Sequence, residues 1–232
     1  MGGPGHAVLV GMQATTTLAD LATTTPGASR VFQRLGLDYC CGGRRPLHQV
    51  CAERGLESAD VLAAIDAEGP SQADLTRWAE APVDALIAHI VATYHARLRE
   101  ELPLLLAMAS KVEQVHAEKP GCPLGLAARL ALIQADVLDH LAKEEQILFP
   151  LLQSGAGPRV AQIVRVMEAE HQDHGTNLAT LRQLTGDFVP PAHACATWRA
   201  LYVRLAAFEA ELMDHIHLEN NVLFPRTVRP IA

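Results

Sequence analysis

Apolar residues recur at intervals of three and four along most of the chain after residue 80, which is the spacing of one buried helical face. Four long segments follow this pattern, and proline and glycine interrupt the sequence between them. The pattern predicts helices at residues 82–109, 123–150, 158–185 and 196–222. Four long helices joined by such connections indicate a four-helix bundle.

The region before the bundle has shorter apolar segments, which predict three or four short helices. Helices of this length are marginal alone, so we expect them to pack on one another. No segment alternates apolar and polar residues as a half-buried strand does. The sequence therefore predicts an all-α protein, with a small helical domain at 14–70, a linker at 68–74 and the bundle domain at 80–228.

Two segments of the bundle repeat one motif: residues 140–150 read HLAKEEQILFP and residues 215–225 read HIHLENNVLFP. In both, a glutamate follows the histidine by four residues, so the pair lies on one face of a helix. Glu144 and Glu219 also fall within the apolar stripes, where an uncompensated carboxylate is costly. Buried His–Glu hydrogen bonds would explain one such motif, but two in register indicate a bound metal.

The first long helix also carries a histidine on its buried side. Its apolar stripe includes Ile87, Val91 and Leu98, and His95 lies in the same row. His89 falls on a different face, where it is solvated or supports the site from outside.

The third long helix offers two histidines on its buried side, His171 and His174. The interval from His95 to His171 nearly equals the interval between the histidines of the two motifs, so we choose His171 as the metal ligand. His174 is assigned to the lining of the site and remains the rival of His171. His217, two residues beyond the histidine of the second motif, is expected to face away.

The candidate metal ligands are His95, His140, Glu144, His171, His215 and Glu219. Six protein ligands exceed the need of one tetrahedral zinc and suit two metal ions about 3.5–4 Å apart with bridging carboxylates. Imidazole and carboxylate without thiolate favour iron or manganese over copper(I). The residues alone leave iron and manganese open.

Composition and charge exclude several function classes. With 49% hydrophobic and 19% charged residues, the chain has the composition of a globular protein, and its net charge of −7 argues against nucleic-acid binding. The apolar runs are too short to span a membrane, and the first twelve residues lack the features of a secretory signal. Five irregularly spaced cysteines do not form a disulfide framework, so we expect a cytoplasmic protein. We assign no function to residues 1–13.

Adjacent cysteines occur in the segment DYCCGG, at Cys40 and Cys41. Consecutive Cα atoms lie about 3.8 Å apart, less than the roughly 4.4 Å or more that a relaxed disulfide spans, so we expect no bond between them. The two thiols either face a metal, a partner or an oxidant, or they are small residues of a turn. The remaining cysteines are interpreted as ordinary small apolar residues: Cys51, Cys122 and Cys195.

Taken together, these motifs resemble those of hemerythrin-like domains and of the bacterial di-iron proteins that repair iron–sulfur clusters. The resemblance covers roughly residues 17–228. It rests on the segments DYCCGG (38–43), YH (94–95), KVEQVHAEKP (111–120), HLAKEEQILFP (140–150), VMEAEH (166–171) and MDHIHLENNVLFP (213–225).

The resemblance implies a small N-terminal domain with a vicinal cysteine pair, followed by a hemerythrin-like bundle. The six candidate ligands would hold two non-haem iron ions, bridged by an oxo or hydroxo group. The implied function is repair of iron–sulfur clusters damaged by nitric oxide or hydrogen peroxide, through supply of iron to damaged iron–sulfur proteins. The alternatives are an enzyme that reduces nitric oxide, or a sensor or scavenger of nitric oxide or oxygen. The resemblance also allows a homodimer.

The resemblance further implies that the two adjacent cysteines act as a thiol relay for iron, electrons or a nitrosyl group. The cysteines would approach the di-iron site or a client, and Gly42 and Gly43 would let the backbone bend and come close. Arg44 and Arg45 would lower the pKa of a thiol and favour the thiolate. The alternative is a buried pair of cysteines without a chemical role.

Overall fold

The structure is a computed structural model that describes residues 13–71, 74–155 and 157–227. All regular elements in these ranges are helical, which confirms the predicted all-α class. The chain divides into two compact units, residues 1–79 and 80–232. Residues 1–12, to which the sequence assigns no function, lie outside the described residues, as do positions 72–73 of the predicted linker.

The first unit contains four short α-helices and one 3-10 turn in its described part. They are α1 (Leu18–Thr24), α2 (Ala28–Leu35), α3 (Leu47–Arg54), α4 (Ser58–Glu68) and η1 (Leu75–Trp78). Leu18 and Phe32, from two of these helices, are fully buried, so the unit has a core of its own. Arg30 of α2 forms ion pairs with Glu68 at the end of α4 and with Asp74 just before η1, which ties these segments together.

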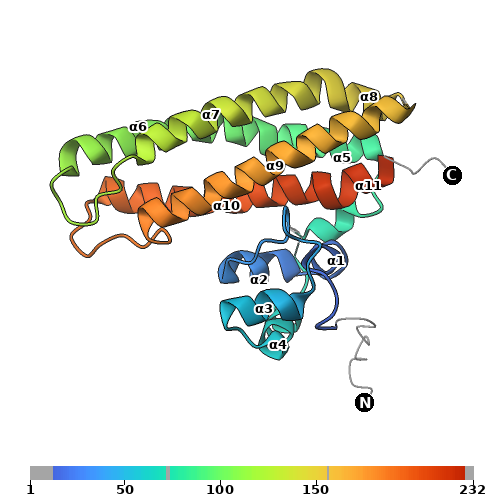
Figure 1. Ribbon diagram of the computed structural model, residues 1–232, viewed down its shortest axis with the longest axis horizontal. Helices are drawn as coiled ribbons and strands as arrows, with labels where there is room; N and C mark the ends of the chain where they lie inside the picture. Colours follow the sequence, from blue (N-terminus) through green and yellow to red (C-terminus); the bar gives the residue numbers. More distant parts are fainter. Residues whose placement is uncertain (1–12, 72–73, 156, 228–232) are drawn as a thin grey trace, which may run out of the picture. The chain divides into compact units, whose positions relative to one another are not determined.

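The second unit is a bundle of four long helices, three of which contain a π-helical turn. The helices comprise α5 (Val83–His89), η2 (Ile90–His95) and α6 (Ala96–His116); α7 (Leu126–Lys143), η3 (Glu144–Leu148) and α8 (Phe149–Gln153); α9 (Gly157–Thr185); and α10 (Ala196–His217), η4 (Leu218–Leu223) and α11 (Phe224–Thr227). Around the bundle, α6 lies beside α7 and α10, and α9 lies beside the same two helices (Figure 1).

The apolar stripes predicted from the sequence form the core of this bundle, with two differences. The first long helix ends at His116 rather than at residue 109, because buried Val112 continues its stripe. Val91 is only half-buried, whereas its neighbour Ile90 is fully buried. The π-turn at residues 90–95 explains this shift, since an i to i+5 turn changes which residues face the core.

Candidate metal centre

The structure brings the six residues predicted as metal ligands together inside the bundle. We call them the His4Glu2 cluster: His95, His140, Glu144, His171, His215 and Glu219. His140 is 2% exposed and the other five are 0% exposed. All four long helices contribute to the cluster, so the site exists only when the bundle is assembled.

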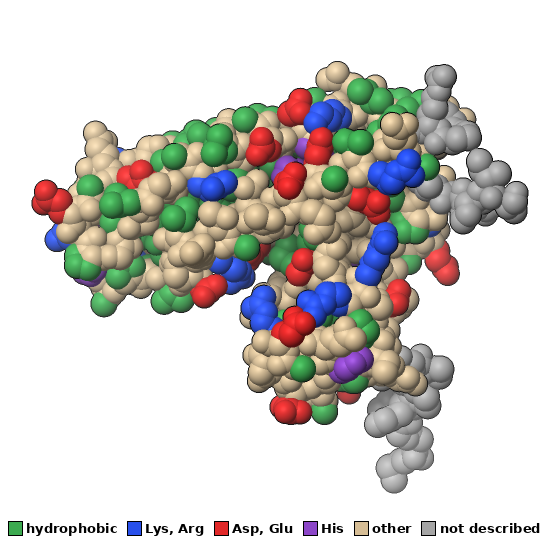
Figure 2. Space-filling view, viewed as in Figure 1, with side chains coloured by type: hydrophobic (Ala, Val, Ile, Leu, Met, Phe, Trp, Pro, Cys, Tyr) green, Lys and Arg blue, Asp and Glu red, His purple; other side chains and the backbone are tan. Residues whose placement is uncertain are grey.

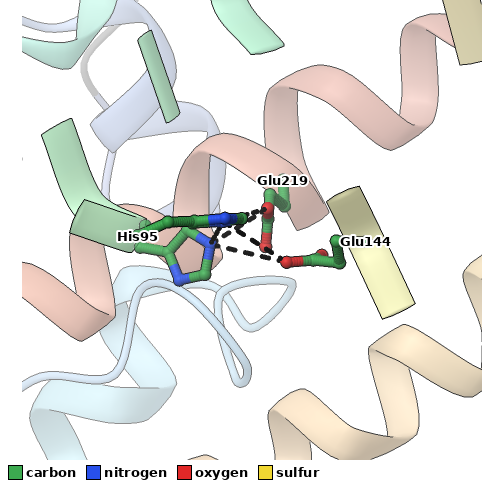
Figure 3. A group of neighbouring side chains, drawn as sticks. His95, Glu144 and Glu219 are labelled. Carbon is green, nitrogen blue, oxygen red and sulfur yellow. Dashed lines mark hydrogen bonds and ion pairs between the residues drawn. The ribbon is translucent and has the colours of Figure 1, made fainter. Parts of the chain in front are cut away.

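The ligand atoms of the cluster form two groups that share both glutamates. His95 and His215 belong to the first group, hereafter the first position, and His140 and His171 to the second position. Within each group the ligand atoms lie within 4.8 Å of one another. Figure 3 shows the His95 imidazole pointing toward the carboxylates of both glutamates.

Each glutamate lies between histidines of both positions, as a bridging ligand would. The carboxylate of Glu219 is 3.0 Å from Nε2 of His215 through Oε1 and 3.2 Å from Nε2 of His171 through Oε2. Oε2 of Glu144 lies 3.4 and 3.5 Å from Nε2 of the other two histidines. The oxygens of both carboxylates are buried and accept no hydrogen bond from the described residues. An uncompensated buried carboxylate is costly, which favours a cation here.

The histidine tautomers of the second position also favour a cation. Nδ1 of His140 donates to Oε2 of Glu170 at 2.8 Å, and Nδ1 of His171 donates to Oδ1 of Asn220 at 2.7 Å. With the proton on Nδ1, each Nε2 carries a lone pair, and the two Nε2 atoms are only 3.0 Å apart. Two facing lone pairs repel each other unless a positive charge draws on both. The donor set therefore fits metal ions.

In the first position, only one of the two histidines has a hydrogen-bond acceptor at Nδ1 among the described residues. Nδ1 of His95 donates to Oε1 of Glu145 at 2.7 Å, and Arg99 holds the same oxygen at 2.8 Å. His215 has no hydrogen-bond partner at Nδ1 among the described residues, and its ring stacks on Tyr94 with centroids 6.0 Å apart. Three of the four histidines thus have an acceptor that fixes the ring and its tautomer, as metal-binding histidines usually do.

The repeated motif supplies these supporting residues as well as the ligands. Glu145 and Asn220 occupy equivalent positions in the two copies, and they accept hydrogen bonds from His95 and His171 respectively. Phe149 of the first motif stacks on His95 with ring centroids 5.7 Å apart, and Phe224 of the second stacks on His171 with centroids 6.0 Å apart. Sequence reasoning missed these roles, although the alignment of the two motifs contains the signal for them.

Burial and mutual charge shift the pKa values of the cluster. Burial lowers the pKa of His95 to about 4 and that of His140 further, so both imidazoles are neutral and able to bind a metal. Burial, together with the charge of Glu219, raises the pKa of Glu144 well above 4.5. Burial alone would also raise the pKa of Glu219, but contacts with His215 and the neighbouring histidines hold it well below 4.5.

Three members of the cluster lie in the π-helical turns of the bundle. His95 ends η2, Glu144 begins η3 and Glu219 is the second residue of η4. Such turns occur frequently at functional sites. Helical periodicity predicts regular α-helices here, and the π-helical turns are a difference from that prediction.

The remaining histidines near the site lie outside both groups of ligand atoms. His174 is buried, and its ring centroid is 5.0 Å from that of His140, as expected for a lining residue. His89 is half-buried and lies 3.0 Å from the hydroxyl of Thr93. His217, expected to face away from the site, is outside the cluster but is fully buried in the core.

In the first unit, the adjacent cysteines lie in a turn that the side chain of Asp38 stabilises through hydrogen bonds. Oδ1 of Asp38 accepts hydrogen bonds from the backbone N–H groups of Cys40 at 3.1 Å and of Cys41 at 2.9 Å. The two sulfurs are 3.6 Å apart and form no disulfide, as expected. Cys40 is buried and Cys41 is half-exposed. With Asp38 they form a group that could hold a metal ion.

The two glycines after the cysteines lie so close to neighbouring atoms that a side chain at either position would collide with them. A Cβ at Gly43 would lie 2.2 Å from the carbonyl oxygen of Tyr39, and a Cβ at Gly42 would lie 2.9 Å from Oδ2 of Asp38. No side chain larger than hydrogen fits at Gly43 without moving the backbone. The small size of these glycines is therefore explained by packing within the turn.

The expectation that the following arginines activate a thiol is wrong for Cys40. Its pKa is raised well above 9.0, first by the hydrogen bond with Cys41, then by burial and by the charge of Asp38. Arg45 instead forms an ion pair with Glu53 of α3.

Comparison with known proteins identifies the family. Residues 86–227 match the hemerythrin HHE cation binding domain, and residues 14–68 match a domain of unknown function, ScdA_N. The iron–sulfur cluster repair protein YtfE of Musicola paradisiaca is 47% identical over 216 residues, which cover 92% of this chain and 96% of the relative. The YtfE proteins of Dickeya chrysanthemi and Pectobacterium atrosepticum are 45% and 43% identical over the same shares. The chain belongs to the YtfE family of iron–sulfur cluster repair proteins.

Membership in the YtfE family confirms the resemblance predicted from the motifs, and the hemerythrin match includes every residue of the His4Glu2 cluster. In the described ranges, no helix is both long and apolar enough to cross a membrane.

Proposed function

We propose that this chain repairs iron–sulfur clusters damaged by nitric oxide or oxidants, and that it supplies iron from two ions held by the His4Glu2 cluster. The observation that carries the proposal is the pair of histidine positions joined by two buried carboxylates. Imidazole and carboxylate donors without sulfur suit iron. The names of the relatives state repair of iron–sulfur clusters, so damaged iron–sulfur proteins are the proposed clients.

Each iron ion would take the two histidines of one position and share both glutamates with the other ion. Bound iron supplies a redox-active Lewis acid with positions left for exchangeable ligands. Glu145, Glu170 and Asn220 accept hydrogen bonds from Nδ1 of three histidines, which would leave the Nε2 lone pairs of these histidines free to bind the ions. The bundle excludes bulk water, because each member of the cluster is almost completely buried.

The adjacent cysteines are the proposed relay for iron or a nitrosyl group during repair. The half-exposed sulfur of Cys41 is the one a client would reach, and Asp38 and Cys40 would complete a transient binding site. The variant Cys41→Ser should keep two irons per chain and an unchanged visible spectrum while losing repair activity. Full repair activity in this variant would remove the relay from the proposal.

Reactivation of a damaged cluster enzyme tests the main proposal. The iron-loaded protein is added anaerobically, with a reductant, to an aconitase-type enzyme inactivated by nitric oxide, and the recovered activity is followed. Wild-type protein should restore activity, whereas Glu144→Leu and Glu219→Leu should bind less iron and fail. Glu100→Gln, an exposed change on α6, is the matched control. Equal reactivation by the two ligand variants, at low iron content, would contradict iron supply.

Reduction of nitric oxide is the second candidate function. Each position has two histidines and two shared carboxylates, so a six-coordinate ion keeps sites for a small ligand such as nitric oxide or oxygen. Headspace analysis separates the two functions. Nitrous oxide formed over many turnovers would favour an enzyme, reversible gas binding without loss of iron would favour a sensor or scavenger, and iron transfer alone would favour a donor.

A further inference from the structure

A cavity of about 370 Å³ opens between α7 and α9, beside the second position of the cluster. Charged side chains and a histidine gather on this face of the bundle (Figure 2). Four carboxylates and one ammonium dominate the lining, together with a histidine: Asp136, Asp139, Glu170, Asp173, Lys143 and His174. Net negative charge makes the cavity attractive to cations.

The polar side chains of the cavity lead from solvent toward the metal ligands. Their exposed fractions fall from 67% for Asp139 through 38% for Lys143 and 23% for Glu170 to 3% for His174. Lys143 forms ion pairs with Asp139 at 2.7 Å and with Glu170 at 2.6 Å. Glu170 in turn accepts a hydrogen bond from the predicted ligand His140. A continuous polar path therefore joins the surface to the second position.

His174 is the innermost residue of this path, and neither ring nitrogen forms a hydrogen bond with the described residues. Buried polar groups are almost always paired, so a buried imidazole with two unpaired nitrogens requires an explanation. Its ring centroid lies 5.0 Å from that of His140 and 6.4 Å from that of His171. An imidazole at the end of an acidic cavity and next to two metal ligands is well placed to bind a metal ion.

The internal repeat provides a comparison within the same molecule. When His95 is aligned with His171, His174 corresponds to Leu98 and Asp173 corresponds to Arg97. Leu98 is fully buried and does not line the equivalent groove between α6 and α10, whereas His174 lines the cavity between α7 and α9. In that groove, Arg97 and Arg204 pair with the carboxylates of Glu211 and Glu101 and neutralise them. The ligands are duplicated in the repeat, but the acidic path is not.

We propose that ferrous iron enters and leaves the centre through the cavity between α7 and α9, and that His174 binds the ion in transit between the surface and the second position. This inference rests on the proposed iron-donor function. Transit is an exchange of ligands without electron transfer: a nitrogen of His174 replaces one cluster ligand on the ion, and water then replaces His174. An entering ion must displace the ammonium of Lys143 from its two carboxylates.

The rate of iron transfer to a chelator tests the inference. Full-length protein loaded with two ferrous ions is mixed anaerobically with ferrozine in stopped flow, and uptake of ferrous iron by the metal-free protein is measured as well. His174→Leu, which introduces the residue found at the equivalent position of the first long helix, should slow both rates at least tenfold. Its iron stoichiometry and visible spectrum should stay those of the wild type, because the six cluster ligands are intact.

Charge variants test the path without altering the buried histidine. Asp173→Asn should slow iron transfer several-fold, and added salt should slow the wild type more than this variant. Glu101→Gln, the matched change in the opposite groove, should leave the rate within a factor of two. These variants keep the inference testable if His174→Leu fails to fold.

The outcomes separate the inference from the proposed function. If the wild-type protein binds no iron or yields none to ferrozine, the iron-donor function fails. If the wild type transfers iron and His174→Leu does so at the same rate, the function stands and the transit role is overturned. A loss of one iron per chain in His174→Leu would also overturn it, because His174 would then be a permanent ligand.

Discussion

Replacing Glu144 by leucine tests whether its carboxylate serves metal binding rather than folding. This side chain is 0% exposed and its oxygens accept no hydrogen bond from the described residues. Leucine has a similar volume and no polar atoms. We therefore expect metal-free Glu144→Leu to be more stable than the metal-free wild type, while losing the capacity to hold two irons.

The expected gain follows from the burial of the carboxylate. Replacing buried charged groups by apolar residues of similar size often stabilises a protein by about 1–4 kcal/mol. In a chain of this size, each ~1 kcal/mol raises the unfolding midpoint by roughly 2–4 °C. The pKa of Glu144 is raised by burial and by Glu219, so the wild type loses stability as pH rises above 4.5. The advantage of the variant should therefore be smallest below pH 4.5 and grow above it.

The matched control is Glu219→Leu, for which we expect the opposite sign. Without a metal, Nε2 of His215 and of His171, at 3.0 and 3.2 Å, can take up a proton and face the carboxylate as a cation, which holds the pKa of Glu219 well below 4.5, so its removal leaves buried partners unpaired. Loss of one partner of a buried pair costs about 3–5 kcal/mol. Calorimetric unfolding of the three metal-free proteins between pH 5 and 8 measures both effects. A metal-free Glu144→Leu less stable than the wild type would refute the reasoning, since the carboxylate would then support the fold.

Three further predictions concern the surroundings of the two sites. Glu145→Ala removes the acceptor of His95 Nδ1 and should weaken iron binding by about 10–100-fold in chelator competition, with two irons still bound at saturation; unchanged affinity would contradict this role. Gly43→Ala should destabilise the first unit by more than about 2 kcal/mol in urea unfolding, because its Cβ would lie 2.2 Å from the carbonyl of Tyr39; a wild-type midpoint would exclude the close contact. Burial lowers the pKa of His95 from 6.5 to about 4, so its contribution to stability is lost as pH falls through this interval; metal-free Glu144→Leu, which lacks the opposing titration of the glutamate, should show this loss by circular dichroism; a flat profile in this variant would contradict burial of a neutral imidazole.

The sequence predicted the members of the His4Glu2 cluster because helical periodicity fixes which residues share a face. His140 and Glu144 are four residues apart, and the same spacing recurs at His215 and Glu219, so their convergence could be inferred without a structure. The π-helical turns could not be inferred in this way, because the spacing of apolar residues tolerates one extra residue per turn. Only the half-buried state of Val91 reveals the shift.

Contacts between distant segments were less predictable than helix faces. Glu145 adjoins a predicted ligand but supports His95, which belongs to another long helix, and this pairing depends on the register of the two helices. The environment of Cys40 was predicted wrongly for the same reason. The nearby arginines were visible in the sequence, whereas the fold of the chain around Asp38 was not.

The internal repeat explains why the site is double, and its exceptions indicate how the two halves differ. In the second position, Nδ1 of His140 donates to a carboxylate and Nδ1 of His171 donates to an amide oxygen. In the first position, Nδ1 of His95 donates to a carboxylate, and Nδ1 of His215 has no partner among the described residues. A hydrogen bond to a carboxylate increases the basicity of the ligand more than one to an amide does, so each position has one strong and one weak histidine. The second position is the better supported of the two, because His171 has an acceptor at Nδ1 and His215 has none among the described residues, so only access to solvent favours release from it. In the proposed function, the iron ion beside His174 should therefore be the first to leave, because its path is open and not because it is bound less tightly.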